Sequence, residues 1–489
     1  MSALTKDKTM RSVALVLAIS AVSVISAAQR GGVAAPEKSP TFSGTIAPIL
    51  YDNCVTCHRA GEAAPFPLIK YEEVAKRAKQ IVKVTGSRYM PPWHAAHGYG
   101  DFADERRLTD DQIDAIARWL KAGMPRGDLS KLPKLPTFAD GWQLGKPDLI
   151  LEMPAAFTVP ADGPDIYRNF ALPTGLAEDK WIRAVEFRPS ARKVVHHALF
   201  SYVRGGAVNA ISSTDGQPGF RGGMPVALIP GFAPAGELGG WAVGTTARFL
   251  PEGLARPISK GSDFILQMHF HPTGKAETEK SVVGLYFSDV PPERRIMTPA
   301  IPGFFGLLAG IDIPPGEKAF TIKGTYTVPV DMRVLSVTGH AHYLGKDIKA
   351  TATKPDGSIE PLLWIQDWDF NWQDRYDYRT PVFLPKGTRI DATITYDNSA
   401  DNPRNPCDPP RRVRWGIQSY DEMGSVGFMM VAANKEDEET LRQQGGAMLK
   451  AALKQAAQSD AVKQYLSQQQ RFMDDMSRGA VDPCAARSQ

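Results

Sequence analysis

Residues 54 to 58 read Cys54-Val55-Thr56-Cys57-His58, and this stretch decides the first part of the fold. Cys-x-x-Cys-His is the attachment signature of c-type haem, in which two thiols join the vinyl groups and the histidine supplies the proximal iron ligand. A bare Cys-x-x-Cys also occurs in redox dithiols and in zinc sites. His58 follows at once and the chain has no second such pair, so the motif predicts one covalent haem c.

Three helices are expected around this motif, in a module that spans residues 29–135. The first precedes the motif, the second covers residues 72–85 and stops at Gly86, and the third starts at a capping box and ends before Gly123 and Pro125. The residues that carry these predictions are Phe42, Ile46, Ile49 and Leu50 for the first helix, and Thr109, Gln112, Ile113, Ile116, Ala117 and Leu120 for the third. Such a small all-α module resembles the cytochrome c family.

The sixth iron ligand should follow the second helix. Met90, in Tyr89-Met90-Pro91-Pro92-Trp93, is the preferred candidate, and its thioether would raise the reduction potential. The alternatives are His94 or His97 as the ligand, or no sixth ligand at all, with Met90 acting only in packing.

The first 28 residues have the pattern of a signal peptide. Lys6, Lys8 and Arg11 precede an apolar stretch over residues 12–26, and Ser26-Ala27-Ala28 offers small residues for cleavage. The apolar run is shorter than a comfortable membrane span, although a retained anchor is an open alternative. We expect a periplasmic or secreted protein with no integral membrane partner.

Composition excludes some classes of function. A net charge of +4 over 489 residues, without a basic cluster, argues against nucleic-acid binding. The length predicts several domains, and the 43 glycines and 39 prolines suit turn-rich β domains. In an oxidising compartment Cys407 and Cys484, the cysteines outside the haem motif, could form a disulfide bond, although they are far apart in the sequence.

From residue 140 onward, short strand-like runs alternate with glycine and proline. We predict two β-sandwich (jelly-roll) domains over residues 140–295 and 296–435, joined to the haem module by a stiff linker that contains Pro133 and Pro136. Residues 436–489 have helical spacing and predict a helical tail. The clearest strand predictions lie at residues 149–151, 181–185, 264–266, 334–335 and 390–394.

All six histidines of this region fall in three groups: His196-His197, His269-Phe270-His271 and His340-Ala341-His342. Histidine is the commonest metal ligand. Residues i and i+2 of a strand share a face, so a His-x-His pair can bind one ion. Adjacent histidines point to opposite faces, so His196 and His197 need a bulge or a strand end to share an ion. Partly buried histidines bonded to the backbone are the alternative for each group taken alone.

Four ordered motifs resemble those of the copper type II, ascorbate-dependent monooxygenases, which are the peptidylglycine α-hydroxylating and dopamine β-hydroxylating enzymes. They are Val195-His196-His197-Ala198-Leu199-Phe200, Leu266-Gln267-Met268-His269-Phe270, His340-Ala341-His342-Tyr343-Leu344-Gly345-Lys346 and Asp421-Glu422-Met423. The resemblance covers roughly residues 145–435.

The resemblance implies two copper ions. His196, His197 and His269 would hold the electron-transfer copper, and His340, His342 and Met423 the catalytic, oxygen-binding copper. Three imidazoles suit copper in either oxidation state, and a thioether favours Cu(I). Met423 as core packing is the alternative for that residue. His271 matches no family ligand, so we expect a supporting role for it, with a reserve ligand as the alternative.

The sequence also departs from this family. The amidating enzymes carry an arginine two residues before the His-x-His pair, where this chain has Thr338, so a peptide substrate is in doubt. Their methionine is followed by a disulfide-forming cysteine, where this chain has Gly424. The family partner of Cys407 is absent, which leaves Cys484 as its candidate partner.

The expected function is that of an exported, haem-fed copper monooxygenase that hydroxylates a C–H bond of a small organic substrate with O2. A periplasmic donor would reduce the haem, which would pass electrons to the three-histidine copper and then to the Met423 copper. The alternatives are a non-enzymatic copper-binding and electron-transfer protein, or a peroxidase-like haem enzyme if the sixth iron position is open.

Overall fold

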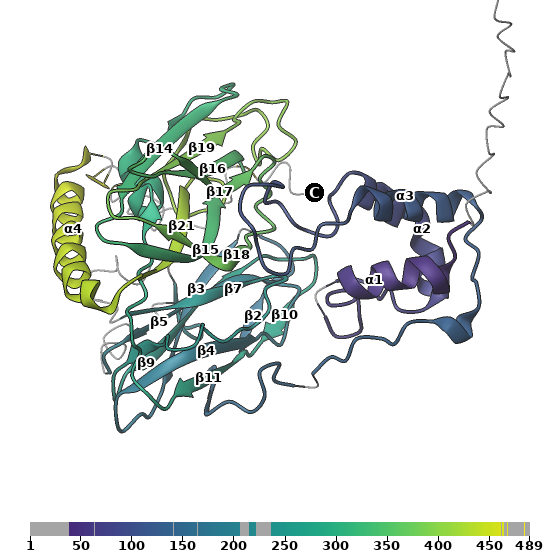
Figure 1. The fold of residues 1–489 in the computed structure, drawn as a ribbon, viewed down its shortest axis with the longest axis horizontal. Helices are drawn as coiled ribbons and strands as arrows, with labels where there is room; N and C mark the ends of the chain where they lie inside the picture. Colours follow the sequence, from purple (N-terminus) through teal and green to yellow (C-terminus); the bar gives the residue numbers. More distant parts are fainter. Residues whose placement is uncertain are drawn as a thin grey trace, which may run out of the picture. The chain divides into compact units, whose positions relative to one another are not determined.

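The computed structural model describes residues 39–460, except 63, 140, 164, 206–214 and 222–235, together with 462, 463, 467 and 484. The predicted signal segment lies outside the described residues. Strands dominate the described chain, and helices occur near its beginning and its end (Figure 1). None of the described helices is both long and apolar enough to cross a membrane.

The helices around the Cys-x-x-Cys-His motif form where the sequence predicts them. A π-helical turn, η1 (Phe42–Ile46), runs into α1 (Ala47–Asn53), and α2 (Tyr71–Gly86) and α3 (Asp110–Lys121) follow. The Thr109–Gln112 capping box is present, with both side chains bonded to the opposite backbone amide. A shared core of Phe42, Leu50 and Trp119 holds these helices together. Whether they form a cytochrome domain stays a prediction.

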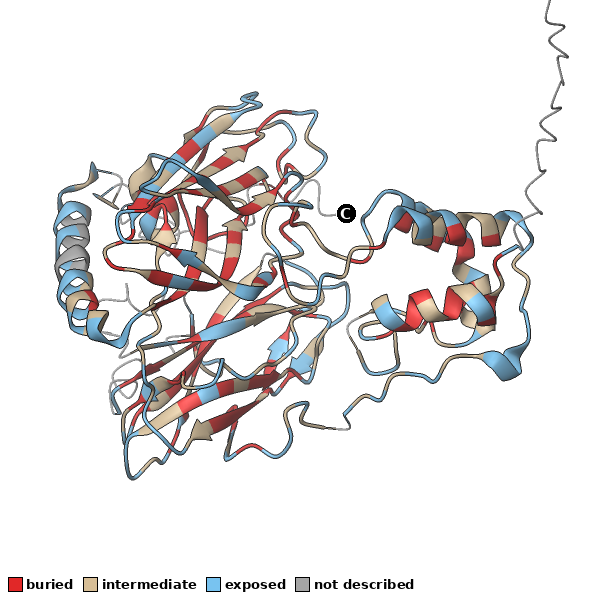
Figure 2. Cartoon of the chain, in the orientation of Figure 1, coloured by how far each residue is buried: buried red, intermediate tan, exposed pale blue. Residues whose placement is uncertain are grey.

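The first β region consists of two sheets around one core (Figure 2). A four-stranded sheet has the order β1-β11-β4-β8, and a five-stranded sheet has the order β6-β3-β9-β5-β7; β2 and β10 pair separately. Large apolar side chains of both sheets, such as Phe187 and Phe264, fill the space between them. The strands are β1 (Leu149–Glu152), β2 (Phe157–Val159), β3 (Ile166–Pro173), β4 (Lys180–Arg188), β5 (Val195–Val203), β6 (Phe220–Arg221), β7 (Gly236–Ala242), β8 (Arg256–Ile258), β9 (Asp263–Phe270), β10 (Glu277–Glu279) and β11 (Val282–Ser288).

The second β region repeats this arrangement. Two four-stranded sheets, β12-β21-β15-β18 and β14-β19-β16-β17, enclose a core that includes Val337 and Ile394. Both β regions are compatible with the predicted sandwiches. The strands are β12 (Ala300–Ile301), β13 (Asp312–Ile313), β14 (Phe320–Thr327), β15 (Met332–Ala341), β16 (Gly345–Thr353), β17 (Ile359–Ile365), β18 (Arg375–Leu384), β19 (Arg389–Tyr396), β20 (Val413–Arg414) and β21 (Gly424–Ala432), and short 3-10 turns occur at η2 (Leu129–Lys131), η5 (Gly303–Ala309) and η6 (Lys435–Asp437).

The loop between α2 and α3 belongs to the core of the second β region. Ala95 forms an isolated β-bridge with Ile365 and Phe102 forms one with Tyr378, and both loop residues are buried in that core. A segment inside the 29–135 range therefore packs as part of the sandwich that starts near residue 296, which ties the helices to this sandwich.

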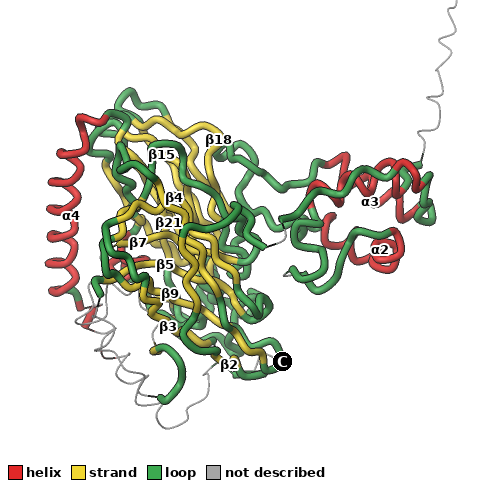
Figure 3. The backbone as a smooth tube through the Cα atoms, turned by 90° about the horizontal axis from the view of Figure 1, so that it is seen from below, coloured by secondary structure: helices red, strands yellow, loops and turns green. Residues whose placement is uncertain are grey.

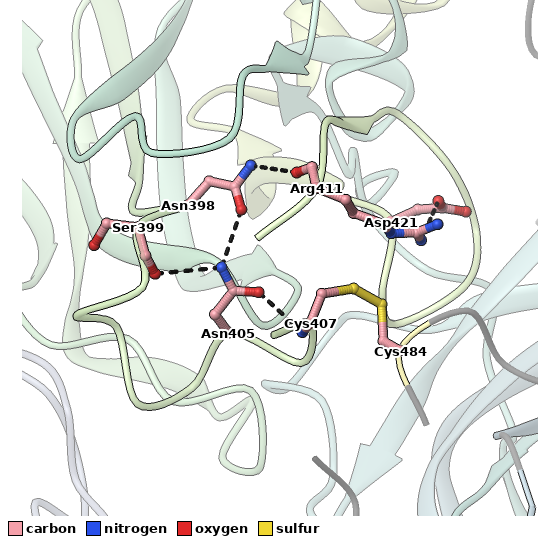
Figure 4. Close-up of a disulfide and its surroundings, with 7 residues drawn as sticks. All are labelled: Asn398, Ser399, Asn405, Cys407, Arg411, Asp421 and Cys484. Atoms are coloured by element: carbon pink, nitrogen blue, oxygen red, sulfur yellow. Dashed lines mark hydrogen bonds and ion pairs between the residues drawn. A yellow bond between two sulfur atoms is a disulfide. The ribbon is translucent and has the colours of Figure 1, made fainter. Parts of the chain in front are cut away.

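The C-terminal part adds a helix and a disulfide bond. The predicted helical tail begins with α4 (Glu438–Gln458), which packs against the second β region through buried Leu441 (Figure 3). Cys407 and Cys484 form the disulfide bond that the sequence left open (Figure 4). Asn405 accepts a hydrogen bond from the Cys407 amide at 3.0 Å. The disulfide bond therefore connects Cys484 to the loop between β19 and β20.

Candidate metal centres

His196, His197 and His269 converge on one point. The Nδ1 atoms of His196 and His197 are 3.0 Å apart, and the Nδ1 atoms of His197 and His269 are 3.3 Å apart. One ligand atom from each of the three rings lies within 4.8 Å of the others, so the three imidazoles can hold a metal ion.

Strand pairing explains this convergence. His197 of β5 lies opposite His269 of β9, and the register between these strands shifts between Val195 and His197. This irregularity at the start of β5 is the one that two adjacent histidines need in order to face a common point.

Asp165 supports the three-histidine group. Its Oδ2 lies 2.9 Å from His269 Nε2, on the side of the ring opposite Nδ1, and its Oδ1 lies 2.7 Å from His271 Nδ1. Burial opposes the charge of this carboxylate, but His269 and the hydrogen bonds of the site hold its pKa well below the ordinary value. His271 is thus placed beside Asp165. Tyr167 stacks on the His269 ring at 4.2 Å between centroids.

His340 and His342 form the second group, at the end of β15. Their ring centroids are 5.3 Å apart. His340 Nδ1 lies 2.7 Å from Gln373 Oε1, and His342 Nδ1 lies 3.1 Å from the carbonyl oxygen of Asp421. These partners occupy Nδ1 and leave the Nε2 of each ring for a metal ion, which is how outer partners usually orient metal-binding histidines.

Met423 is buried and directly precedes β21, which pairs with β15 so that Ala341 faces Gly424. Hydrogen bonds fix the Met423 backbone and the side chain of the residue before it. Tyr396 Oη donates to the Met423 carbonyl at 2.9 Å, and the buried Glu422 carboxylate accepts from the amides of His342 and Leu344 at 2.9 and 2.6 Å. Burial raises the pKa of Glu422 well above its ordinary value. These bonds bring Met423 to the end of β15 that carries the His340 group.

Phe370 lies between the two histidine groups. Its ring centroid is 4.9 Å from that of His196 and 5.6 Å from that of His342, and Tyr343 packs on it at 4.6 Å. Aromatic packing therefore connects the two groups directly.

The electrostatics of both groups favour neutral imidazoles. Burial, together with neighbouring histidines, lowers the pKa of His196 to about 3 and that of His197 well below its ordinary value. Burial lowers the pKa of His340 to about 4 and that of His342 well below its ordinary value. Because only neutral imidazoles bind metals, and one ligand atom from each of three such rings lies within 4.8 Å of the others, the residues present fit a bound cation.

The haem motif follows α1 directly. Cys54 and Cys57 are free, half-buried thiols, and burial raises the pKa of Cys54 to about 12. His58 Nδ1 lies 3.0 Å from the Phe66 carbonyl oxygen, which leaves Nε2 for an iron ion. Two thiols and an imidazole oriented in this way fit a covalently attached haem.

The sixth iron ligand stays a prediction. The Met90 amide donates to the Val84 carbonyl at the end of α2, at 3.0 Å. His94 Nδ1 lies 3.1 Å from the Asp367 carbonyl oxygen and its Nε2 is buried without a partner, whereas His97 is exposed.

Sequence reasoning missed Asp165, Gln373 and Phe370. They lie outside any histidine motif, and their roles arise from contacts with residues at least 27 positions away in the chain. No sequence signal marked them. Glu422 was part of a quoted motif, but its contacts with the backbone after β15 were not foreseen.

Comparisons with known proteins add no relationship. No family model and no curated protein matches this chain. Among solved structures, the major capsid protein P2 of bacteriophage PM2 is 10% identical over 58% of this chain and 96% of its own, with a TM-score of 0.23. A structure of infectious bursal disease virus, Gx strain, is 8% identical over 61% of this chain and 74% of its own, with a TM-score of 0.17. A structure of PNGF-II is 11% identical over 60% of this chain and 63% of its own, with a TM-score of 0.19. These scores are too low to carry an argument.

Proposed function

We propose that this chain is an exported haem c and dicopper monooxygenase that hydroxylates a C–H bond of an organic substrate with O2, using electrons that enter through the haem. The observation that carries the proposal is the pair of histidine groups, one with three converging imidazoles and one with two imidazoles whose Nδ1 atoms are already occupied. We also propose that the β regions are related to the copper type II monooxygenases. The helices around the haem motif would then form a cytochrome c domain.

Each group has the ligand chemistry of a different copper role. Three imidazoles bind copper in both oxidation states, which suits electron transfer, and a thioether from Met423 beside two imidazoles favours Cu(I). When bound, copper would supply the one-electron chemistry and the O2 activation that protein side chains lack. The chain itself orients the ligands, through Asp165 at His269 and Gln373 at His340.

Electron entry through the haem is supported by contacts between the haem module and the second β region. Arg106, in the loop between α2 and α3, pairs with Asp374, which is largely buried. The residue before Asp374 in the chain is Gln373, whose Oε1 lies 2.7 Å from His340 Nδ1. This ion pair thus holds the loop of the haem module against the second β region, next to the residue that contacts His340.

Metal analysis and oxygen uptake test the proposal. Purified protein should carry about two copper ions per haem, and His340→Ala or Met423→Leu should abolish substrate-dependent oxygen uptake while the haem spectrum stays unchanged. The exposed Lys318, which pairs with Asp401, supplies the control, because Lys318→Gln should alter neither copper content nor oxygen uptake. Absence of copper, or turnover that survives both ligand substitutions, would contradict the proposal.

One observation favours a second candidate, a non-enzymatic copper and electron carrier. Phe370, His269 and His342 are buried, and the Phe370 ring packs against both histidine groups. A carrier would bind about two copper ions and exchange electrons with the haem, yet consume no oxygen with any organic substrate. Oxygen consumption therefore separates the two candidates.

A further inference from the structure

A cavity of about 430 Å³ lies beside the haem motif. Thr56 and Cys57 line one side, and strands β4 and β7 of the first β region line another, including Trp241. None of the six proposed copper ligands lines it. This volume is in the range of small-molecule sites.

Arginines dominate the cavity wall. Seven arginines but only two carboxylates, Glu62 and Glu186, are among the residues that line it. The Glu186 carboxylate already accepts the backbone amides of Gln143 and Leu144, at 2.7 and 3.1 Å. Four of the arginines have carboxylate partners among the described residues: Arg59 and Arg192 at Glu62, and Arg248 and Arg375 at Asp377.

Two further arginines contact aromatic rings. The guanidinium carbon of Arg183 lies 4.3 Å from the Phe249 ring centroid, and that of Arg188 lies 5.0 Å from the Trp142 ring centroid. Neither has an ion-pair partner among the residues that the structure describes. Stacking leaves the edge N–H groups of a guanidinium available, so both can still donate to an anion.

Arg256 differs from the other six arginines in its hydrogen-bond partners. It donates to the Glu237 carbonyl oxygen at 3.1 Å and contacts the Met429 sulfur at 3.7 Å, and within the described chain no carboxylate accepts a hydrogen bond from it. Burial lowers the pKa of its guanidinium, although the Glu237 carboxylate opposes this change. Arg59 adds a buried Nε that lacks an acceptor. Guanidinium groups therefore outnumber carboxylates along this wall, and an anion bound in the cavity would balance the excess positive charge.

We propose that this cavity is a binding site for carboxylate groups, with Arg256 and Arg188 as principal donors. Planar guanidinium groups match carboxylates through paired hydrogen bonds. Two sources have this chemistry: a free small organic acid that binds beside the haem motif, or the carboxylates of the haem attached there. The site requires neither copper nor oxygenase activity, so it can be tested even if the proposed function fails.

Calorimetry on the full-length, haem-bearing protein tests the first source, with succinate as the probe and uncharged butane-1,4-diol as the matched control ligand. A free-acid site should bind one succinate and no diol. Arg256→Gln and Arg188→Gln should each raise the Kd roughly tenfold or more, as expected for a lost charge-assisted hydrogen bond. Arg389→Gln, at an exposed arginine paired with Asp391 on β19, should leave the Kd unchanged.

If the haem carboxylates fill the cavity, the haem-bearing protein should not bind succinate. The Cys54→Ser, Cys57→Ser double variant cannot attach haem, so it should bind succinate. Arg256→Gln should then raise the pH at which the haem midpoint potential becomes pH-dependent, because loss of a cation raises a carboxyl pKa. Far-UV circular dichroism verifies that each variant is folded. The proposal is overturned if neither form of the protein binds succinate and both arginine variants leave that pH unchanged, or if the diol binds as well as succinate.

Discussion

Asp165 shows how much one buried carboxylate contributes to the three-histidine group. It contacts His269 and His271 of one β region and accepts the Ser419 hydroxyl from the other, four residues before Met423. A single side chain therefore orients a proposed ligand of one group and steadies the segment that carries a ligand of the other.

Asp165→Asn should weaken copper binding at the three-histidine group by about 10- to 100-fold, the usual effect of losing a carboxylate that orients a metal-binding histidine. Titration with copper against a competing chelator, followed by electron paramagnetic resonance, measures this loss. Asp179→Asn removes an exposed carboxylate, bonded to the Lys260 amide, and should have no effect. Equal copper affinity in both variants would exclude an orienting role for Asp165.

The buried histidines predict a pH dependence of the metal-free protein. The folded-state pKa values of His196 and His340 are lowered to about 3 and about 4, from an ordinary 6.5. As the pH falls below about 6.5 the unfolded chain binds protons that the folded chain does not, so folding stability declines until the folded pKa is reached. Each histidine can remove up to about 1.4 kcal/mol of unfolding free energy per pH unit in this window.

Urea denaturation of copper-free protein at several pH values between 7 and 4 measures this decline. His340→Gln should reduce its slope, because one of the contributing groups is gone. An unfolding free energy that stays constant from pH 6.5 to pH 4 would show that the histidines are not buried as the structure places them.

At the level of elements, the pairing of β15 with β21 positions Met423. A Cβ at Gly424 would lie 1.9 Å from Tyr396 Oη, the hydroxyl that donates to the Met423 carbonyl. Since Tyr396 is fully buried and its ring cannot retreat into solvent, even a methyl group is excluded at position 424. Glycine at position 424 thus has a steric reason.

Gly424→Ala should destabilise the protein by about 1–3 kcal/mol, as overpacking of a tight core does, and should weaken binding of Cu(I) by displacing Met423. Thermal unfolding and Cu(I) titration with a chromophoric chelator measure the two effects. Gly86→Ala, at the end of α2 where a Cβ meets nothing within 4 Å, is the matched control and should be close to neutral. If both variants are equally stable, the contact with Tyr396 does not restrict position 424.

At the scale of the whole molecule, the loop between α2 and α3 joins the helices around the Cys54–His58 motif to the second β region. Ala95 and Phe102 are in its core, and Arg106 pairs with the buried Asp374. Burial raises the pKa of Asp374 although Arg106 opposes this change, so the carboxylate depends on its partner for its charge.

Arg106→Gln should therefore leave a buried carboxylate unpaired and lower the unfolding free energy by about 1–3 kcal/mol, less than for a fully buried pair because Arg106 is partly exposed. It should also slow the reoxidation of reduced haem in copper-loaded protein, followed by stopped-flow absorbance. Arg118→Gln, on the surface of α3, is the control and should change neither quantity. Unchanged reoxidation in Arg106→Gln would mean that this ion pair is not needed to hold the haem module in position for electron transfer.

Local sequence patterns were sufficient to predict several of the helices and strands. The capping box at Thr109 and the apolar spacing before Cys54 predict helices that the structure contains, because capping and amphipathicity act within a few residues. The strand-like runs at residues 181–185 and 390–394 likewise lie in β4 and β19. The embedding of Ala95 and Phe102 in a β core could not be predicted, since it depends on partners more than 250 residues away.

By itself, the sequence determined the Cys54–His58 motif, the three histidine groups and the need for an irregular strand at His196, because each depends on covalent spacing or on side-chain alternation within one strand. Only the tertiary structure decided which nitrogen atoms converge, that Asp165, Gln373 and Phe370 support and connect the two groups, and that seven arginines meet in a cavity beside Cys57. The reason is physical: these contacts are set by the register of strands paired across long sequence distances, which local periodicity does not encode.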